Sequence, residues 1–271
     1  MNITLNDGVV MPQLGFGVFQ IPDAETTAAV STALATGYRS IDTAAIYGNE
    51  AGVGTAIAAS GIPRDELFVT TKLWISDLGR ASARDALRAS LDRLGLDHVD
   101  LYLIHWPAPA TDAYLEAWQG LEDLRADGLT RSIGVSNFEP AHLNRIAGLG
   151  GTVPSVNQIE LHPLLRNRAA EAAASRHGTV TEAWSPLAQG GALDAAPIVA
   201  AARAHGVTAA QVVLRWHLQQ GRVVIPKSVT PHRIAENFDV FGFELSAPEL
   251  AAIDALDADG RTGPHPLTFN G

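Results

Sequence analysis

Two patterns of hydrophobic and polar positions alternate along this chain of 271 residues. Short runs rich in β-branched and aromatic residues end in clusters of polar side chains, and amphipathic stretches rich in alanine follow them. Strands that alternate with helices predict parallel strands connected by crossover helices. The runs predicted to form strands are residues 15–19, 39–42, 67–72, 99–105, 130–135, 155–158, 180–184 and 223–226, and helical patterns include residues 26–36, 80–94, 113–126, 196–205 and 209–219.

The strand–helix units follow one another with no low-complexity linker between them. A closed (β/α)8 TIM barrel, which is an α/β fold, routinely uses about 250 residues as one domain, so we expect a single domain over residues 1–271. An N-terminal β-hairpin should precede the barrel, with strands over residues 3–5 and 9–11 and a turn at Asn6-Asp7-Gly8. We expect this hairpin to plug the bottom of the barrel.

A doubly wound open sheet is the rival architecture. Its dinucleotide-binding form needs Gly-x-Gly-x-x-Gly between the first strand and the first helix. The nearest sequence begins at Gly15-Phe16-Gly17 but has Gln20 at the position of the third glycine, and no Walker A sequence occurs. A nucleotide bound to this chain would therefore have to be held by other means.

The composition narrows the partners. A formal net charge of −10 repels phosphate backbones, so we expect no nucleic-acid partner, although a local basic pocket for a small phosphate ligand stays open. The absence of cysteine excludes disulfides, thiolate catalysis and Cys-ligated zinc. The N-terminus shows no signal-peptide pattern, and the longest apolar run, residues 195–202, is far shorter than the about 20 residues that cross a bilayer. We therefore expect a cytoplasmic protein without a membrane partner.

Four residues with complementary chemistry stand at or just after the ends of predicted strands. Asp42, Lys72 and His105 close the second, third and fourth strands, and Tyr47 follows Asp42 closely. In a barrel these ends meet at one mouth, where active sites lie. Each residue alone has an ordinary explanation: a helix cap, a packed phenol, a solvated amine or a structural imidazole. The set of four, brought to one mouth, indicates a catalytic site.

The four residues match the needs of carbonyl reduction by hydride. The developing alkoxide needs a proton donor, and a free tyrosine, with a pKa of about 10, is a weak acid. A nearby ammonium, as from Lys72, stabilises the phenolate of Tyr47 and lowers its pKa. Asp42 would hold Lys72 in place and charged, and His105 would orient the carbonyl oxygen by a hydrogen bond.

These segments resemble a known family. Gly37-Tyr38-Arg39-Ser40-Ile41-Asp42-Thr43-Ala44 with Tyr47-Gly48-Asn49-Glu50 resembles the first signature of the aldo-keto reductase superfamily, and Thr71-Lys72-Leu73-Trp74 and His105-Trp106-Pro107 resemble its lysine and histidine segments. The resemblance covers nearly the whole chain in order and is closest to short bacterial reductases of the 2,5-diketo-D-gluconate reductase type. It implies an NADPH-dependent reductase of aldehydes, ketones or dicarbonyls, often a monomer, with Tyr47 as proton donor.

The resemblance also implies the cofactor site. Ser136 and Asn137, helped by Gln158, would bind the nicotinamide carboxamide, and Trp184 would stack on the nicotinamide ring, where many relatives have tyrosine. Ser185 and Leu187 would approach the pyrophosphate, whereas Gly190 and Gly191 are expected to form a flexible connection. The adenosine end is assigned to the segment ending in Lys227, Ser228 and Val229 and to the helix that follows: Lys227, Ser228 and Arg233 for the 2′-phosphate, Glu236 and Asn237 for the adenine.

Two cations at the start of a helix make a suitable phosphate site. A basic helix start that merely faced water would oppose the helix dipole, which favours the phosphate-binding interpretation. For the substrate we expect walls made by Phe19, Trp74, Trp106 and Ile46. The short tail, residues 260–271, suggests an open and permissive pocket, and His162 is interpreted as structural.

Two other functions compete with this interpretation. A metal-dependent barrel hydrolase would need paired ligands such as His-Glu-x-x-His, and none of the nine histidines is spaced in that way, so we expect no metal. A non-enzymatic NADPH-binding sensor or regulatory barrel would bind the cofactor without turnover. The intact set of Asp42, Tyr47, Lys72 and His105 argues against it.

Overall fold

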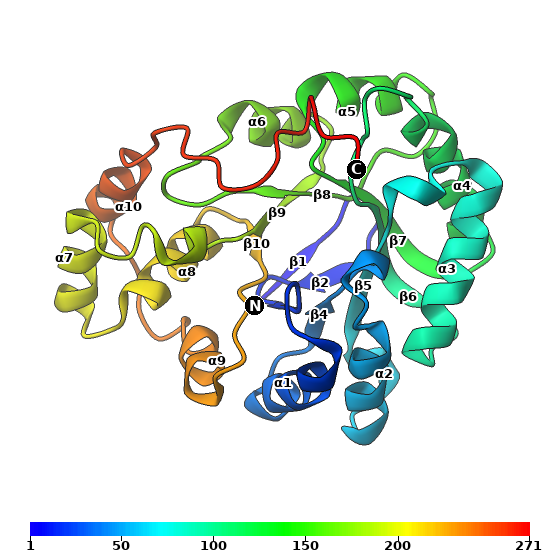
Figure 1. Ribbon diagram of the computed structural model, residues 1–271. Helices are drawn as coiled ribbons and strands as arrows, with labels where there is room; N and C mark the ends of the chain where they lie inside the picture. The colour runs from blue at the N-terminus through cyan, green and yellow to red at the C-terminus, as the bar shows by residue number, and fades with distance from the viewer.

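Eight parallel strands form one sheet in the computed structural model, which describes all of residues 1–271. The sheet order follows the sequence from β3 to β10, and Figure 1 labels its strands from β4 onward. Each predicted strand is present, with ends shifted by a residue or two at most. The strands are β3 Phe16–Gly17, β4 Ser40–Asp42, β5 Phe68–Leu73, β6 Val99–Ile104, β7 Thr130–Ser136, β8 Val156–Glu160, β9 Val180–Trp184 and β10 Val223–Val224.

The first and last strands of this sheet meet and close the barrel. The amide of Gly15 donates to the carbonyl oxygen of Val224 at 2.8 Å, and the amide of Gly17 donates to that of Pro226 at 3.2 Å. Gly17 is required at this seam, because a Cβ there would lie 2.9 Å from the carbonyl oxygen of Ile225. The predicted (β/α)8 barrel is thus confirmed, although β3 and β10 keep only two paired residues each.

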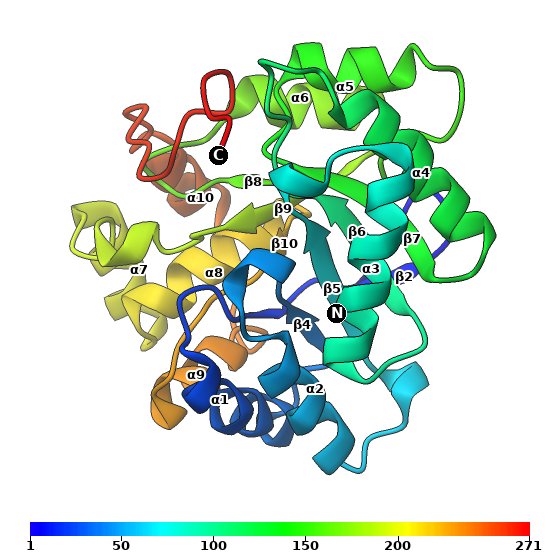
Figure 2. The same ribbon diagram turned by 45° about the vertical axis from the view of Figure 1, so that its right-hand side comes forward.

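Helices surround the sheet on its outer side, as Figures 1 and 2 show. No single helix is long and apolar enough to cross a membrane; α7 and α8 have the required length and composition only as a pair, bent by 94° at the break between them. The helices are α1 Asp23–Thr36, α2 Glu50–Ala59, α3 Arg80–Leu94, α4 Tyr114–Ala126, α5 Pro140–Ala147, α6 Arg168–Arg176, α7 Ala196–His205, α8 Ala209–Gln219, α9 Pro231–Phe238 and α10 Ala247–Asp254.

The predicted hairpin lies under the barrel. Its strands are β1 Asn2–Thr4 and β2 Val10–Pro12, which pair antiparallel one residue away from the expected positions. Met11 is fully buried and belongs to a small apolar cluster with residues of the barrel strands, among them Leu101 and Val156. The hairpin therefore closes the end of the barrel opposite the mouth, as predicted.

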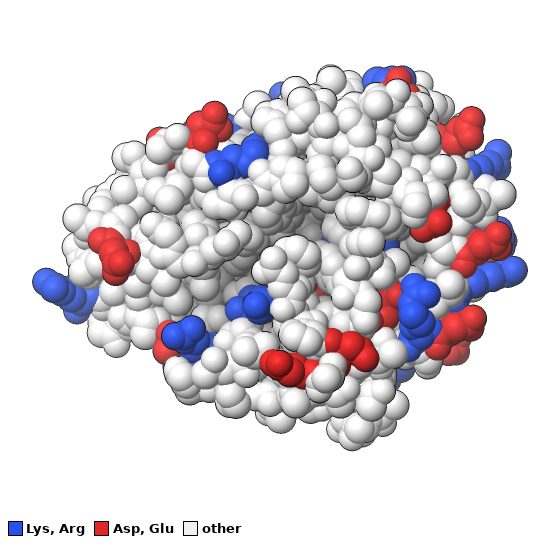
Figure 3. All heavy atoms as spheres, viewed as in Figure 1, with Lys and Arg blue, Asp and Glu red and all other residues white.

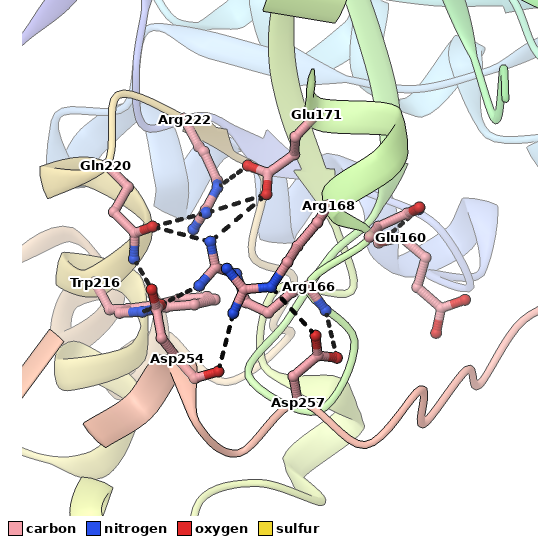
Figure 4. Close-up of polar contacts among 10 residues, drawn as sticks. Glu160, Arg166, Arg168, Glu171, Trp216, Gln220, Arg222, Asp254 and Asp257 are labelled. Carbon is pink, nitrogen blue, oxygen red and sulfur yellow. Dashed lines mark hydrogen bonds and ion pairs between the residues drawn. The ribbon is translucent and has the colours of Figure 1, made fainter. Parts of the chain in front are cut away.

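A network of buried arginines ties the loop after β8 to α8 and α10 (Figure 4). The guanidinium groups of Arg166 and Arg222 lie 5.2 and 4.7 Å from the ring centre of Trp216. Glu171 pairs with both arginines, and Asp254 pairs with Arg166 and accepts a hydrogen bond from the Trp216 indole at 2.8 Å. Removing one partner of such a buried ion pair leaves an unmatched charge, which is costly.

This network gives the first testable prediction. Arg166→Ala should lower the free energy of unfolding by about 3 kcal/mol, because it leaves the carboxylates of Glu171 and Asp254 partly unmatched. Arg168→Ala is the matched control, since its side chain is 60% exposed, and should cost less than about 0.5 kcal/mol. Urea denaturation followed by circular dichroism measures both variants. Equal losses in the two would contradict a stabilising role for the network.

Candidate active site

The barrel interior holds a lysine and an aspartate in direct contact. Lys72 on β5 has no exposed surface, and its ammonium lies 2.6 Å from Oδ1 of Asp42, the last residue of β4. The ammonium also donates to the carbonyl oxygen of Thr43 at 2.9 Å. Strand alternation places Lys72 inside, because its neighbour Thr71 points the other way and donates to Glu50 on α2 at 2.6 Å. The pairing predicted from the sequence is present.

Tyr47 reaches this ion pair from the mouth side. It ends a 3₁₀ turn, Ala45–Tyr47, and Gly48 at φ 68° turns the chain away after it. The Tyr47 hydroxyl lies 3.4 Å from Nζ of Lys72, and the ammonium lies 5.1 Å from the centre of the phenol ring. The phenol therefore stands next to a positive charge, as the sequence predicts.

His105 completes the set. It follows β6, is buried, and its ring centre lies 5.6 Å from that of Tyr47 and 5.2 Å from that of Trp74. Neither ring nitrogen forms a hydrogen bond within the protein. Burial, and secondly the charge of Lys72, holds the pKa of His105 well below its ordinary value, so the imidazole is neutral at neutral pH. A neutral imidazole with an unused N–H can donate to a carbonyl oxygen.

The pKa of Tyr47 differs from the value expected from the sequence. Burial raises the pKa of Tyr47; Lys72 lowers it, as expected, but does not outweigh burial, so the pKa of the phenol lies above its ordinary value. Burial opposes the charge on Lys72 too, yet Asp42 and Tyr47 outweigh it and raise the pKa of the ammonium. Tyr47 is thus protonated and Lys72 charged at neutral pH, which is the state that a proton donor and its stabilising cation need.

The residues predicted around the nicotinamide form one connected group. Trp184 ends β9, and its indole N–H donates to Oδ1 of Asn137 at 2.8 Å. The side-chain amide of Asn137 donates to the carbonyl oxygen of His105 and to Oγ of Ser136, each at 3.0 Å. The Ser136 hydroxyl donates to the carbonyl oxygen of Gln158 at 2.8 Å. The donors of Ser136 and Asn137 are all bonded inside the protein, and each side-chain oxygen already accepts one hydrogen bond, so each can accept only one more from a ligand.

Gln158 bridges two carboxyl groups. Its side-chain nitrogen donates to Asp42 at 2.8 Å and to Glu182 at 2.9 Å. Its oxygen accepts no hydrogen bond from the protein and so remains able to accept from a ligand. Sequence reasoning missed Glu182, although one signal was present: Glu182 and Trp184 are two residues apart in the predicted strand, which puts an acidic residue on the same face as the indole.

The loop after β9 has an unusual backbone. Ser185, Ala188 and Gln189 have φ values of 47°, 51° and 53°, which residues with a Cβ rarely adopt. Such conformations cluster at ligand-binding loops. Leu187 is half-buried within the loop, and the exposed Gly190 is also left-handed, with φ 92°. The segment predicted to approach the pyrophosphate therefore has a defined turn conformation up to Gly190.

The predicted adenosine site lies at the start of α9. Thr230 precedes this helix without capping it through its side chain, and the hydroxyl of Ser228 accepts from the Thr230 amide at 3.1 Å. Lys227 and Arg233 are exposed and form no ion pair within the protein. In the face of the molecule drawn in Figure 3, basic groups lie along the lower rim of the central hollow. The same segment carries the exposed Val229, the half-buried Glu236 and the buried Asn237.

The aromatic residues predicted for the substrate pocket surround Tyr47 and His105. Phe19 is 55% exposed, and its ring centre lies 5.0 Å from that of Tyr47. Trp74 is half-buried beside His105, whereas Trp106 is 7% exposed. Ile46, in the turn that carries Tyr47, is 49% exposed. The four predicted wall residues at the mouth are Phe19, Ile46, Trp74 and Trp106.

The C-terminal tail was missed as part of this pocket, and the expectation of an open site is wrong at one wall. The ring of Phe269 packs on Trp106 with ring centres 4.6 Å apart and reaches Trp74 at 6.4 Å. The side chain of Asn270 accepts from the Ala110 amide at 2.9 Å and holds the tail end over the mouth. A short tail thus still contributes one wall of the expected pocket.

Glu160 anchors the same tail further back. Its Oε1 accepts from the amide and from the hydroxyl of Thr262, both at 2.6 Å, and from Nε2 of His162 at 3.2 Å. Gly263 packs against Trp184, where a Cβ would lie 2.5 Å from the indole. His162 is fully buried in this anchor, a position that agrees with a structural role.

These features fit an extended nicotinamide dinucleotide. Gln158 offers an acceptor oxygen for the carboxamide NH₂, and the indole of Trp184 is fixed in orientation by Asn137. The cations Lys227 and Arg233 near the start of α9 can neutralise a 2′-phosphate.

Comparison with known proteins gives the family. Residues 13–258 match the Aldo/keto reductase family. The chain is 56% identical over 269 residues to an aldo-keto reductase of Mycolicibacterium vanbaalenii, covering 99% of this chain and 96% of that protein. It is 54% identical to methylglyoxal reductase DkgA of Escherichia coli, covering 99% of this chain and 98% of the relative.

Solved structures agree. A variant of Gox0644 in complex with NADPH superposes with a TM-score of 0.95 at 47% identity, covering 99% of this chain and 98% of that one. An aldo-keto reductase of Bombyx mori in complex with NADP has a TM-score of 0.90 at 38% identity, covering 96% and 94%. The chain therefore belongs to the aldo/keto reductase family, the NADPH-dependent oxidoreductases that reduce carbonyl groups to alcohols.

Proposed function

We propose that this reductase converts small 2-oxoaldehydes such as methylglyoxal to hydroxy-carbonyl products, with Tyr47 as the proton donor. The name of the Escherichia coli relative, which is 54% identical, supports this substrate class. A mouth narrowed by Trp74, Trp106 and Phe269 also favours a small substrate.

One observation carries the proposal. The phenol of Tyr47 and the unbonded imidazole of His105 lie side by side at the mouth, with ring centres 5.6 Å apart. The Lys72–Asp42 ion pair lies directly behind the phenol, with the ammonium 3.4 Å from its hydroxyl. Two donors therefore converge where a carbonyl oxygen can sit, and one of them is backed by a positive charge.

The residues of the chain have separate roles in this reduction. NADPH, when bound by the residues assigned to it below, would supply the hydride for the carbonyl carbon. The neutral imidazole of His105 and the hydroxyl of Tyr47 hold the carbonyl oxygen by hydrogen bonds and orient it. The O–H bond of Tyr47 breaks as its proton passes to that oxygen, and Lys72 stabilises the resulting phenolate. Asp42 keeps the ammonium charged and in position.

We propose for the cofactor the contacts that the sequence resemblance implies. We assign the carboxamide to the oxygens of Ser136, Asn137 and Gln158, and the ring face to Trp184. Ser185 and Leu187 belong to the pyrophosphate. The adenosine end takes the remaining residues: Lys227, Ser228 and Arg233 for the 2′-phosphate, Glu236 and Asn237 for the adenine, and Val229 in the same cofactor-binding segment.

We further propose that the chain acts as one domain and as a monomer in the cytoplasm, without nucleic-acid or membrane partners. A single family match over residues 13–258 and one large apolar core support a single domain. The net charge of −10 disfavours contact with nucleic acid. Light scattering after size-exclusion chromatography tests the monomer, and a stable dimer would contradict it.

Tyr47→Phe should keep NADPH binding but reduce kcat with methylglyoxal by about 10²–10⁴-fold, because it removes the proton donor and leaves the ring. Loss of NADPH absorbance measures turnover, and quenching of tryptophan fluorescence measures binding. Tyr102→Phe is the matched control, since the Tyr102 hydroxyl is buried on β6 without any partner. A wild type that binds NADPH but turns over no carbonyl would favour the sensor alternative, and near-normal turnover by Tyr47→Phe would refute its role.

Arg233→Ala should weaken NADPH binding by about 10- to 100-fold and leave NADH binding unchanged. A charge-assisted hydrogen bond to phosphate contributes about 1.5–3 kcal/mol, and only NADPH carries the 2′-phosphate. Arg203→Ala, an exposed arginine on α7, is the control. Isothermal titration with both cofactors gives the two dissociation constants. If Arg233→Ala weakened the binding of NADPH and of NADH equally, Arg233 would not be the residue that binds the 2′-phosphate.

A further inference from the structure

A second carboxyl group is buried beside the catalytic ion pair. Glu182 on β9 has no exposed surface and stands opposite Gln158 on β8 and Val223 on β10. The side-chain nitrogen of Gln158 joins it to Asp42 across the barrel interior, at 2.9 and 2.8 Å. A chain of carboxyl, amide and carboxyl groups thus ends at the residue that holds Lys72.

This arrangement fixes the orientation of the Gln158 amide. Two carboxyl oxygens face one nitrogen, and only an NH₂ group can donate to both. The amide oxygen is therefore turned away from both carboxyl groups and is free to accept from the nicotinamide carboxamide. Without Glu182 only the bond to Asp42 holds the NH₂ group, so the orientation of the amide is fixed less firmly.

The charges around Glu182 do not balance. One cation, Lys72, faces two carboxyl groups, Asp42 and Glu182. Oε1 of Glu182 is buried without any partner, and a bare carboxylate oxygen is more costly there than a hydroxyl. Burial, and then the charge of Asp42, raises the pKa of Glu182 to about 8, although Gln158 and Lys72 act in the opposite direction. Glu182 therefore keeps its proton at neutral pH.

Few other groups can set this charge state. Glu160, two residues beyond Gln158, has its carboxylate bonded to the tail at Thr262 and Gly263. The flanking strand β10 contributes only apolar residues, Val223 and Val224. The ionisable groups that interact with Glu182 are Asp42 on β4, Lys72 on β5 and Tyr47 on the turn after β4.

We propose that Glu182 is a positioning residue for the reduction: it turns the Gln158 oxygen toward the nicotinamide, and its loss of a proton weakens Tyr47 as an acid. The inference rests on the proposed roles of Gln158 and Tyr47. A negative charge on Glu182 raises the pKa of Tyr47 further, so the phenol gives up its proton less readily. The wild-type kcat should therefore fall as pH rises through about 8.

The test compares the pH profile of kcat in Glu182→Gln and the wild type, with methylglyoxal and saturating NADPH. Glutamine keeps a carbonyl oxygen for Gln158 and cannot ionise, so the fall near pH 8 should disappear or move to higher pH. Glu244→Gln is the control, because the side chain of Glu244 is 81% exposed, and should keep the wild-type profile. An unchanged profile in Glu182→Gln overturns the proton-linked part of the proposal.

A second variant tests the positioning part. Glu182→Ala removes the acceptor and should raise the NADPH dissociation constant by about tenfold, whereas Glu182→Gln should restore most of the affinity. Equal affinity in Glu182→Ala and the wild type overturns it. If the wild type fails to reduce methylglyoxal or to bind NADPH, the proposed function itself is refuted. If the wild type reduces methylglyoxal and binds NADPH, a negative result with the Glu182 variants overturns only the role proposed for Glu182.

Discussion

The ammonium of Lys72 lies inside the barrel with none of its surface in contact with water, so its charge has to be matched there. An unpaired charge at such depth would cost several kcal/mol. Asp42 supplies the match at 2.6 Å, and the carbonyl oxygen of Thr43 takes another of the ammonium hydrogens. The pairing of β4 with β5 keeps these groups in reach of each other. The catalytic site and this part of the fold are therefore stabilised by the same contact.

The same ion pair organises the cofactor side of the site. Asp42 uses one oxygen for Lys72 and the other for Gln158, which in turn contacts Glu182. A substitution at Asp42 would consequently disturb the proton donor and the nicotinamide contact together. The tail is held separately, by Glu160 and Asn270, and its Phe269 adds a pocket wall that makes no contact with the Lys72–Asp42 ion pair.

The alternation of short β-rich runs with alanine-rich helical patterns predicted all eight strands and the longer helices. Helix α2 was not among the predicted helices, because Gly52 and Gly54 interrupt its hydrophobic pattern. Gly54 is needed there because the helix packs on the backbone of Leu94. The catalytic residues were visible because strand ends and the family resemblance pointed to them together. The role of Phe269 could not be predicted from the sequence, because its contact with Trp106 depends on the path of the tail. That path is fixed by the contact with Glu160, which no local sequence pattern encodes.

Lys72, held by Asp42, offsets part of the effect of burial on the acidity of Tyr47. Nuclear magnetic resonance of protein labelled with carbon-13 at the tyrosine ring can follow the ionisation of Tyr47 across the alkaline range, with Tyr47→Phe to assign its signal. The comparison is with Lys72→Met combined with Asp42→Asn, which leaves no unmatched carboxylate. Since Lys72 lowers the pKa of Tyr47 more than Asp42 raises it, the pKa of Tyr47 should be higher in the double variant. An unchanged or lower pKa would contradict the claim.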